Sequence, residues 1–391
     1  MSQGPGHSEP VVIDGARGEG GGQILRTSLA LSMITGRPLH MQRIRAGRAK
    51  PGLRRQHLAC IEAAAQLCQA EVRGGGVGSQ ELVFTPGAIT GGEMEIDIGT
   101  AGSTTLVVQT IAVPAIAAGV ALRAVIRGGT HNPLAPPFEF LERVWRPHLQ
   151  AMGAKISLAL DRHGFASGGE PAEPDRAAER ANGQLTLEIG AGGALGPIDL
   201  VETGPVASRR ATAILSRLPS HVAEREHAIV RERLGFSAAE CEVREVRGAG
   251  PANVLLIELE RAGGRELVSA FGEKGLRAER VAQHACDDAA AFLAADVPVG
   301  AHLADQLLLP LAIAGGGRFR SMPLSLHATT NIATIREFLD VAIEAAPDSP
   351  IDRSHGGGPP PHPPRYGFAD RAAPSPSVVV TVGRPGRLDH L

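Results

Sequence analysis

The order of strands and helices recurs along this chain, and this recurrence constrains the fold more than any single motif. Residues 11–84 read as strand, helix, strand, helix, strand, strand. The same βαβαββ order returns over 94–189, and a third copy, which begins on a helix, spans 304–382. Such a unit buries one sheet face under two helices, and stacked units complete a core. The sequence therefore predicts an α/β (α+β) protein whose large domain contains three βαβαββ units.

One stretch interrupts this order. It reads as a long charged helical region over 208–234, then three strands, then a helix over 278–295. We therefore predict a smaller α/β domain at 190–296, inserted into a discontinuous large domain formed by 1–189 and 297–391. The Pro-, Gly- and His-rich residues before the last predicted strand, 348–376, are interpreted as a disordered connection.

Composition excludes some classes of protein. A net charge of -2 excludes a general polyanion binder but permits a local basic patch. Aromatic residues make up 3% of the chain, too few for aromatic stacking to dominate single-strand binding. Nearly all basic residues are arginines, which bind phosphate bidentately, although a GC-rich coding bias explains this excess equally well.

Cysteine usage and hydropathy predict a cytoplasmic protein. The four cysteines form no C-x-x-C pair, which indicates reduced thiols rather than a zinc site or a disulfide framework. The first ten residues are polar, so no signal peptide is expected. The most apolar run, 106–122, contains Gln109 and Pro114 and reads as a buried helix and strand rather than a membrane span.

A glycine-rich loop connects the first predicted strand to the first helix, with the sequence Asp14-Gly-Ala-Arg-Gly-Glu-Gly-Gly-Gly-Gln-Ile-Leu-Arg26. Glycines allow positive φ and close approach of a ligand, and the helix N-terminus offers free N–H groups to an anion. In this loop Glu19 suits a metal ion and Arg26 suits a phosphate. The loop matches neither the dinucleotide pattern nor the Walker pattern. A tight strand-to-helix turn is the structural alternative.

A basic run precedes the second helix of the first unit. Six cations occur without an intervening acidic residue, at Arg43, Arg45, Arg48, Lys50, Arg54 and Arg55. Because the dipole of a helix N-terminus disfavours cations, this placement favours an anion-binding role over a solvated charged face. Gln56 and His57 follow in the first turns of the helix. For His57 the alternative is a structural histidine on the apolar face.

Two loops of the second unit connect a predicted strand to a predicted helix, as the glycine-rich loop and the basic run do in the first unit. Residues 99–103 precede the helix that carries Gln109. Residues 128–137, Gly-Gly-Thr-His-Asn-Pro-Leu-Ala-Pro-Pro, form a rigid loop that suits lining a base pocket, although a purely structural loop explains it equally well.

His327 lies between a strand that ends near Pro323 and a helix predicted to begin at Thr330 or Asn331, both good N-caps. The positive end of the helix disfavours protonation of the ring and therefore favours the neutral, nucleophilic imidazole. The same dipole stabilises a phosphoryl group attached to the ring. A structural histidine is again the alternative.

Together these stretches resemble the RNA 3′-terminal phosphate cyclases. The segments that carry the resemblance are 14–26, 44–53 with Gln56-His57, 132–137, 162–165, 221–226, 303–307, and His327 with Thr330-Asn331. The resemblance implies three βαβαββ units with a small inserted domain.

The resemblance also implies a reaction in three steps. ATP adenylylates a histidine and releases pyrophosphate, AMP moves to an RNA 3′-phosphate, and the 2′-hydroxyl displaces AMP to leave a 2′,3′-cyclic phosphate. AMP supplies a leaving group, and the adjacent hydroxyl supplies effective concentration. The implied substrates are ATP and RNA with a 3′-phosphate end, and the implied ion is Mg²⁺ or Mn²⁺. Neither a membrane nor an obligate protein partner is implied.

Carried over by position, His327 is implied as the adenylylated nucleophile and Glu19 as the ligand of the divalent ion. The residues implied to hold phosphates of ATP or of the RNA end are Arg26, Arg45, Arg48, Gln56 and His57. The residues implied to form the nucleotide pocket are Gln109, Ala135, Pro136, His302, Leu303, Ala304, Asp305 and Gln306.

Three features depart from the family pattern. His302 stands where an aromatic residue such as tyrosine is expected, which weakens base stacking. Arg162-His-Gly-Phe165 is followed by Ala166-Ser-Gly-Gly-Glu170, where a proline and a third glycine are expected. The linker before 378–382 and the tail at 384–391 are unlike the family, and the departure concerns the C-terminal hairpin rather than the site.

Two alternative functions stay open. Catalytically silent relatives of ribosome assembly share the fold but lack the histidine, and His327, Glu19 and Arg26 argue against them. Enolpyruvyl transferases use a similar repeat and hold anionic metabolites with lysines and arginines. Three lysines in the whole chain, and a histidine before Thr330-Asn331, fit that class badly.

Overall fold

The computed structural model describes residues 9–165, 183–348 and 377–383. The first unit contains β1 (Val11–Asp14), α1 (Gly22–Thr35), β2 (Leu39–Gln42), α2 (Arg55–Cys68), β3 (Glu71–Arg73) and β4 (Leu82–Thr85), in that order. Its sheet has the order β1-β2-β4-β3. β1 pairs parallel with β2, and β4 pairs antiparallel with both β2 and β3.

The second unit has the same topology. It contains β5 (Gly92–Asp97), α3 (Thr104–Ala117), β6 (Leu122–Gly128), α4 (Phe138–Phe140), a π-helical turn (Leu141–Trp145), α5 (Arg146–Ala151), β7 (Ile156–Arg162) and β8 (Gly183–Ile189). Its sheet has the order β5-β6-β8-β7, again with a parallel first pair and an antiparallel second pair. The second helix of this unit is therefore three consecutive helical pieces.

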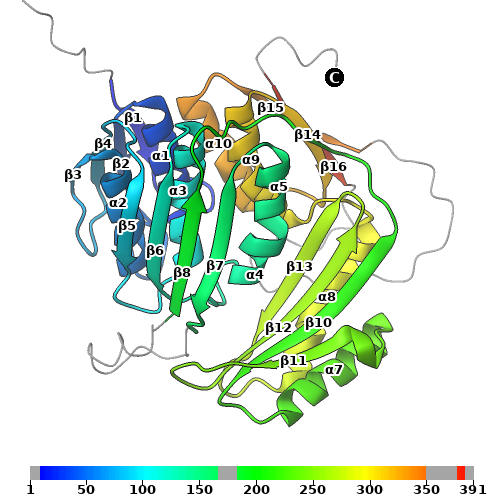
Figure 1. The fold of residues 1–391 in the computed structure, drawn as a ribbon. Helices are drawn as coiled ribbons and strands as arrows, with labels where there is room; N and C mark the ends of the chain where they lie inside the picture. Colours follow the sequence, from blue (N-terminus) through cyan, green and yellow to red (C-terminus); the bar gives the residue numbers. More distant parts are fainter. Residues whose placement is uncertain (1–8, 166–182, 349–376, 384–391) are drawn as a thin grey trace, which may run out of the picture.

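The third unit completes the series. It contains β9 (Asp199–Leu200), α9 (Ala301–Ala314), β14 (Gly317–Ser321), α10 (Leu326–Phe338), β15 (Ala342–Pro347) and β16 (Val378–Gly383). Its sheet order, β15-β16-β14-β9, is the same pattern read from the other edge. The predicted mixed α/β fold with repeated βαβαββ units is confirmed. The three units lie side by side in Figure 1.

β9 supplies the first strand of the third unit. The sequence did not predict this strand, because the third copy was expected to begin on a helix. β9 lies inside the range predicted for the insertion, yet it pairs in parallel with β14 through Asp199 and Leu200. A two-residue strand is too short to carry a period-2 pattern, so only its pairing reveals it. The boundaries proposed for the two domains stay a prediction.

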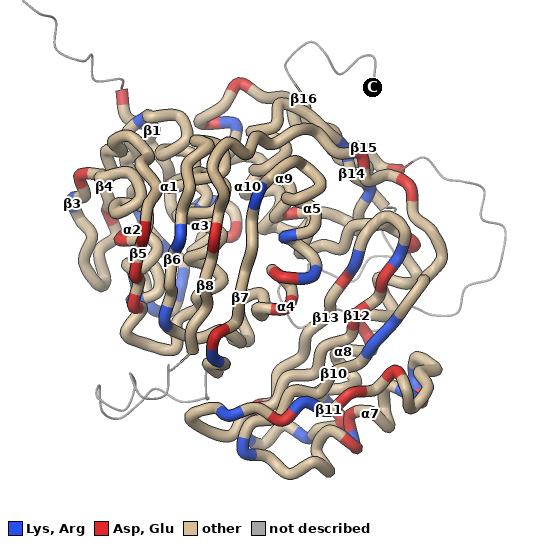
Figure 2. The backbone as a smooth tube through the Cα atoms, viewed as in Figure 1, with Lys and Arg blue, Asp and Glu red and all other residues tan. Residues whose placement is uncertain are grey.

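The segment between β9 and α9 forms its own sheet and helices. It contains β10 (Val206–Ser216), α7 (His221–Leu234), a short 3₁₀ turn (Ala238–Glu240), β11 (Cys241–Glu245), β12 (Ala252–Arg261), β13 (Gly264–Phe271) and α8 (Ala278–Ala295). The sheet order is β11-β10-β12-β13. In Figure 1 this segment projects from the three units, and Figure 2 shows acidic and basic residues interspersed along it.

The helix predicted over 208–234 is wrong in its first half. Val206–Ser216 is a strand at the centre of the inserted sheet, paired with β11 on one side and β12 on the other. Its last six residues are all buried. A short run that is buried on both faces does not alternate between apolar and polar residues, so its sequence does not distinguish a strand from a helix.

Buried side chains join the three units into one core, which includes Leu29 of α1, Ile111 of α3 and Leu307 of α9. Helix α1 packs against both α3 and α10, and α9 packs against α10. The helices of the first and third units are therefore neighbours, although about 300 residues separate α1 from α10 along the chain. None of the helices in the described ranges has the length and apolarity that crossing a membrane requires.

Candidate active site

The glycine-rich loop of the first unit lies directly on helix α10 of the third unit. Gly18 has φ +58°, and a Cβ added there would lie 2.2 Å from Thr330 Oγ1. The backbone N–H of Glu19 donates to the same hydroxyl at 3.0 Å. Only glycine permits both this backbone conformation and this approach. The loop is therefore fixed against the beginning of α10.

Helix α10 begins earlier than the sequence predicts. Its N-cap is Ser325, whose hydroxyl accepts from the N–H of Ala328 at 3.1 Å, rather than Thr330 or Asn331. His327 consequently lies in the first turn of the helix. The ring remains near the positive end of the helix dipole, as expected, but it is part of the helix and not of the loop before it.

A chain of amides and a carboxylate orients His327. Gln23 Nε2 donates to Asp305 Oδ1 at 2.5 Å, which directs Gln23 Oε1 toward His327 Nδ1, also at 2.5 Å. An amide oxygen only accepts, so Nδ1 of the ring carries the proton and Nε2 carries the lone pair. Asp305 is held in turn by Asn331, whose Nδ2 donates to the same Oδ1 at 2.9 Å.

Burial raises the pKa of Asp305, while the hydrogen bonds from Asn331 and Gln23 lower it. The amide network thus offsets part of the cost of a carboxylate in this position.

The free nitrogen of His327 faces Glu19 and solvent. Nε2 lies 4.0 Å from Glu19 Oε1, and the His327 side chain is 54% exposed whereas that of Glu19 is 11% exposed. Glu19 Oε2 accepts from the Gly21 N–H at 2.7 Å, and Oε1 is paired with the guanidinium of Arg48. A group that enters from solvent can therefore reach His327 Nε2 beside a fixed carboxylate.

His57 and Arg26 meet at the N-terminus of α1. A Cβ added at Gly22 would lie 2.7 Å from His57 Nε2 and 3.0 Å from Arg26 Nη1. His57 Nδ1 accepts from the Arg54 N–H at 2.9 Å, so the neutral ring carries its proton on Nε2. Burial lowers the pKa of His57 to about 3, with further lowering by Arg26, Arg45 and Arg54. A neutral N–H donor and a guanidinium thus converge where the helix dipole favours an anion.

Arg45, Arg48 and Gln56 lie on the rim of this corner. Arg45 Nη1 donates to the carbonyls of Lys50 and Gly52 at 2.9 and 2.8 Å, so it fixes its own loop. Burial lowers the pKa of Arg45, as do the neighbouring charges of Arg48 and Arg54. A Cβ added at Gly102 would lie 3.0 Å from Gln56 Cβ, so the predicted loop 99–103 packs on α2.

The residues implied for the nucleotide pocket divide into two groups. Gln109 on α3 and Gln306 on α9 each have a buried polar atom, Nε2 and Oε1 respectively, for which no partner exists among the described residues. Helices α3 and α9 pack together. An unmet donor and an unmet acceptor on two adjacent helices suit the polar edge of a base.

The other implied pocket residues are placed differently. Leu303 and Ala304 are fully buried in the core, so their side chains do not face a ligand. His302 is exposed. Ala135 and Pro136 are half-buried, and the Pro136 carbonyl accepts from Thr105 Oγ1 at 2.8 Å, which anchors their loop to α3.

Comparison with known proteins places the chain in a family. The model of a family described as RNA 3′-terminal phosphate cyclase matches residues 17–345. The chain is 48% identical over 334 residues to the RNA 3′-terminal phosphate cyclase of Ectopseudomonas mendocina, with 85% of this chain and 94% of that protein covered. Its identity to proteins of the same name is 42% over 345 residues in Koribacter versatilis (88% and 94% covered) and 45% over 334 residues in Salmonella enteritidis (85% and 94% covered).

The chain belongs to the RNA 3′-terminal phosphate cyclase family. The resemblance inferred from the sequence motifs is confirmed, and so is the assignment to the enzymes of this family. Individual residue roles are not tested by these similarities and stay predictions.

Gln23 is a residue of this candidate site that the sequence motifs did not single out. It lies within the glycine-rich motif, and its side chain is buried although polar. A polar residue on the buried side of a predicted amphipathic helix was the available signal. Its partner across the interface was not readable, because Asp305 lies 282 residues away.

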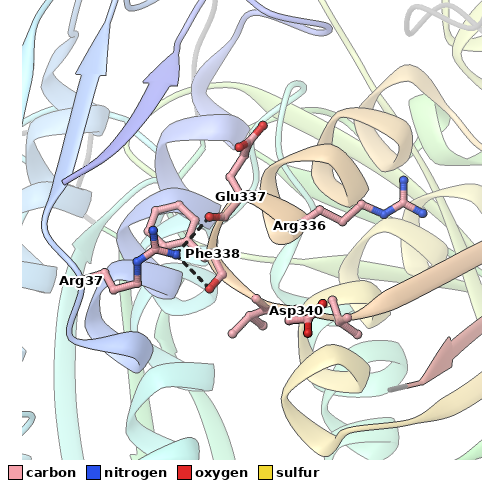
Figure 3. A pocket seen from close by; sticks show the side chains of 7 residues that line it. Arg37, Arg336, Glu337, Phe338 and Asp340 are labelled. Atoms are coloured by element: carbon pink, nitrogen blue, oxygen red, sulfur yellow. Dashed lines mark hydrogen bonds between the residues drawn. The ribbon is translucent and has the colours of Figure 1, made fainter. Parts of the chain in front are cut away.

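A separate cavity of about 490 Å³ lies at the other end of α10 (Figure 3). Arg37 there donates to the carbonyls of Glu337 and Phe338 at 3.1 and 3.3 Å. His327 and Phe338 are separated by about 16 Å at 1.5 Å of helix rise per residue. This cavity is therefore separate from the candidate site around His327.

Proposed function

We propose that this protein converts an RNA 3′-terminal phosphate to a 2′,3′-cyclic phosphate with ATP, through AMP bound covalently to His327. The observation that carries the proposal is the state of His327. Its Nδ1 proton is held by Gln23, and its Nε2 lone pair is half-exposed beside Glu19. This is the form of imidazole that attacks phosphorus.

In the first step His327 Nε2 attacks the α-phosphorus of ATP. A P–N bond forms, the bond to the β-phosphate oxygen breaks, and pyrophosphate leaves. The ring becomes cationic while Nδ1–H remains bonded to Gln23 Oε1. Asp305, bonded to the other end of the same amide, supports this charge through the oriented dipole of Gln23.

In the second step an oxygen of the RNA 3′-phosphate attacks the phosphorus of the histidine-bound AMP. The P–N bond breaks and neutral His327 is restored. In the third step the 2′-hydroxyl attacks the RNA phosphorus, AMP leaves, and the cyclic phosphate remains. Arg26, the Nε2–H of His57 and the N-terminus of α1 are proposed to hold the phosphates in line for these attacks.

A divalent ion fits Glu19 only together with a nucleotide. Both Glu19 oxygens already have partners, the Gly21 N–H and Arg48, and Mg²⁺ typically takes one or two carboxylates plus substrate phosphates. We propose that Glu19 holds Mg²⁺ or Mn²⁺ when the phosphates of ATP supply further oxygens and Arg48 turns away. Such an ion would neutralise charge on the phosphates.

The base of ATP is proposed to lie between α3 and α9. Gln109 Nε2 would donate a hydrogen bond to the base and Gln306 Oε1 would accept one from it. Both buried polar atoms would then have a hydrogen-bond partner. Ala135 and Pro136 would close the pocket from the second unit. The exposed ring of His302 would take the place of a stacking aromatic residue.

The test is covalent labelling by ATP that carries a radioactive α-phosphate, with Mg²⁺, followed by a denaturing gel. We expect label on the wild-type protein and none on His327→Ala. A matched control is His221→Ala, an exposed histidine on α7 that is expected to label normally. Label that persists in His327→Ala would overturn the assignment. An unlabelled wild type would favour a catalytically silent member of the family.

A further inference from the structure

A second cluster of ligand-type side chains lies in the second unit, apart from His327 and Glu19. His131 is in the loop after β6, Glu139 is on α4, and His163 follows β7. Each offers one ligand atom, and the three atoms lie within 4.8 Å of one another. Two imidazoles and one carboxylate form a donor set that binds zinc in proteins, with a fourth position left for water.

We propose that His131, Glu139 and His163 bind one divalent transition-metal ion of the Zn²⁺ class, which fixes the loop at 128–137 to β7. This site is separate from the divalent ion proposed at Glu19. It does not depend on the chemistry proposed for His327.

One nitrogen of this cluster, His163 Nε2, has no hydrogen-bond partner among the described residues. His131 Nε2 and Glu139 Oε2 are 2.8 Å apart, and both residues are 1% exposed. His163 Nε2 is also buried, but no described residue forms a hydrogen bond with it. A buried polar atom without a partner costs free energy, and a metal bond to Nε2 would remove that cost.

The surroundings of His131 suit a metal ligand. Its Nδ1 lies 2.8 Å from Thr130 Oγ1, and that hydroxyl lies 3.2 Å from the Gly164 carbonyl. When Nδ1–H donates to Thr130 and Thr130 donates to Gly164, Nε2 presents its lone pair to the ion. Metal-bound histidines are commonly oriented in this way by a hydrogen bond at the other nitrogen.

One cation competes for the cluster. Arg244 on β11 of the inserted segment lies 3.8 Å from Glu139 Oε1, and it also pairs with Glu242 at 3.2 Å. Oε2 of Glu139 faces His131 instead, so the two carboxylate oxygens serve different partners. The ion would take Oε2 and leave Arg244 on Oε1.

Metal binding requires the side chains of this cluster to move from their present positions. Tetrahedral zinc with Zn–N near 2.0 Å places its ligand atoms about 3.4 Å apart. The present separations, 2.8 Å for one pair and at most 4.8 Å for the set, bracket this value. The His131 and His163 rings are stacked with centroids 5.3 Å apart and an interplanar angle of 17°, so binding one ion requires the His163 ring to turn its Nε2 toward Glu139.

The test uses the full-length protein, stripped of metal and titrated with Co²⁺, whose visible absorption is strong in four- or five-coordinate sites. We expect one equivalent of Co²⁺ to give a strong band and one equivalent of Zn²⁺ to abolish it. Zn²⁺ is also expected to raise the Tm. His163→Ala and Glu139→Gln are expected to weaken Zn²⁺ binding by about 100-fold.

Controls separate this cluster from other histidines. His221→Ala is expected to bind normally, and so is the double variant His355→Ala/His362→Ala, whose positions lie outside the described residues. Should His163→Ala fail to fold, His163→Phe removes the nitrogen and keeps a ring beside Phe165. The proposal is overturned by a wild type without the strong band, by His163 variants that bind as tightly as wild type, or by loss of the band in the double variant.

Discussion

At His327 the ring is oriented by an amide rather than directly by a carboxylate. A carboxylate in contact with Nδ1 would favour the protonated ring, which has no lone pair on Nε2. Gln23 transmits the orientation set by Asp305 without placing a negative charge on the ring. The single residue Gln23 therefore connects the loop of the first unit to His327, the proposed nucleophile, in the third.

The role of Gln23 predicts a separation between nucleotide binding and chemistry. Gln23→Met keeps the side-chain length but removes both hydrogen bonds, so the His327 ring loses its fixed orientation. We expect histidine labelling by ATP to slow by about 100-fold while the Kd for ATP changes little. Gln66→Met, at an exposed position of α2, is the control and is expected to label at the wild-type rate. Equal labelling rates in Gln23→Met and wild type would refute the orienting role.

His57 predicts a dependence of stability on pH. Its folded pKa of about 3 lies below the ordinary value of 6.5, so the unfolded chain binds more protons between these values. Its contribution is therefore present above pH 6.5 and is lost as pH falls toward 3. Between pH 7 and pH 5 the loss is about 2 kcal/mol.

The measurement compares urea unfolding of wild type and His57→Gln at the two pH values. The advantage of the wild type is expected to shrink by about 2 kcal/mol at pH 5. Burial raises the pKa of Glu226 to about 7 and so acts in the opposite direction, but this effect is common to both proteins and cancels in the comparison. Parallel pH profiles would show that His57 is not held neutral.

At the scale of elements, the site is an interface between a loop and a helix from different units. The glycine-rich loop contacts α10 through Gly18 and Glu19, both at Thr330. Helix α1 then packs along α10. This contact sets the distance between Glu19 and His327, because the two residues are far apart along the chain.

Gly18 offers a test of that contact. Gly18→Ala places a methyl group 2.2 Å from Thr330 Oγ1 at φ +58°, so the loop must move away from α10. We expect labelling of His327 to fall by about 100-fold. Gly36→Ala is a matched control, because Gly36 has φ +68° with no atom within 4 Å of the added Cβ. It should lose about 1 kcal/mol of stability and keep its labelling rate. Similar labelling in the two variants would argue against the contact.

At the scale of the whole molecule, the inserted sheet is buried on both faces. On β12, Leu256 belongs to the core shared with the three units, whereas Leu255 belongs to a second core under α7 and α8. Arg143 of the second unit also pairs with Glu258 of the same strand. The inserted segment is thus packed against the units and is not suspended on flexible connections.

This packing predicts that the insertion and the units unfold together. Leu256→Ala is expected to destabilise the protein by about 3 kcal/mol. The single tryptophan, Trp145, lies in the second unit and is 2% exposed, so its fluorescence reports unfolding outside the insertion. We expect its urea midpoint to shift with that of the circular dichroism signal. Val243→Ala, at a 42% exposed position of β11, should shift neither. A Trp145 midpoint that stays fixed would mean independent unfolding.

The sequence by itself determined the repeated order of elements and the loops at which chemistry is proposed. Glycines, prolines and the period of hydrophobic residues determine structure over a few residues. The sequence therefore predicts the loop at 14–26 and the helices α1, α2 and α8. The sequence misread Val206–Ser216, because a strand buried on both faces has the same short apolar run as a helix. It also missed β9, which exists only through its pairing with β14.

Only the tertiary structure decided which residues meet. The contacts of Gln23 with Asp305, of Thr330 with the glycine-rich loop, and of His131 with His163 join segments between 32 and more than 300 residues apart. Their distances depend on how the units stack and how strands cross over, which local periodicity does not encode. The tautomer of His327 is likewise a property of the assembled site, since it follows from the carboxylate that fixes the amide beside it.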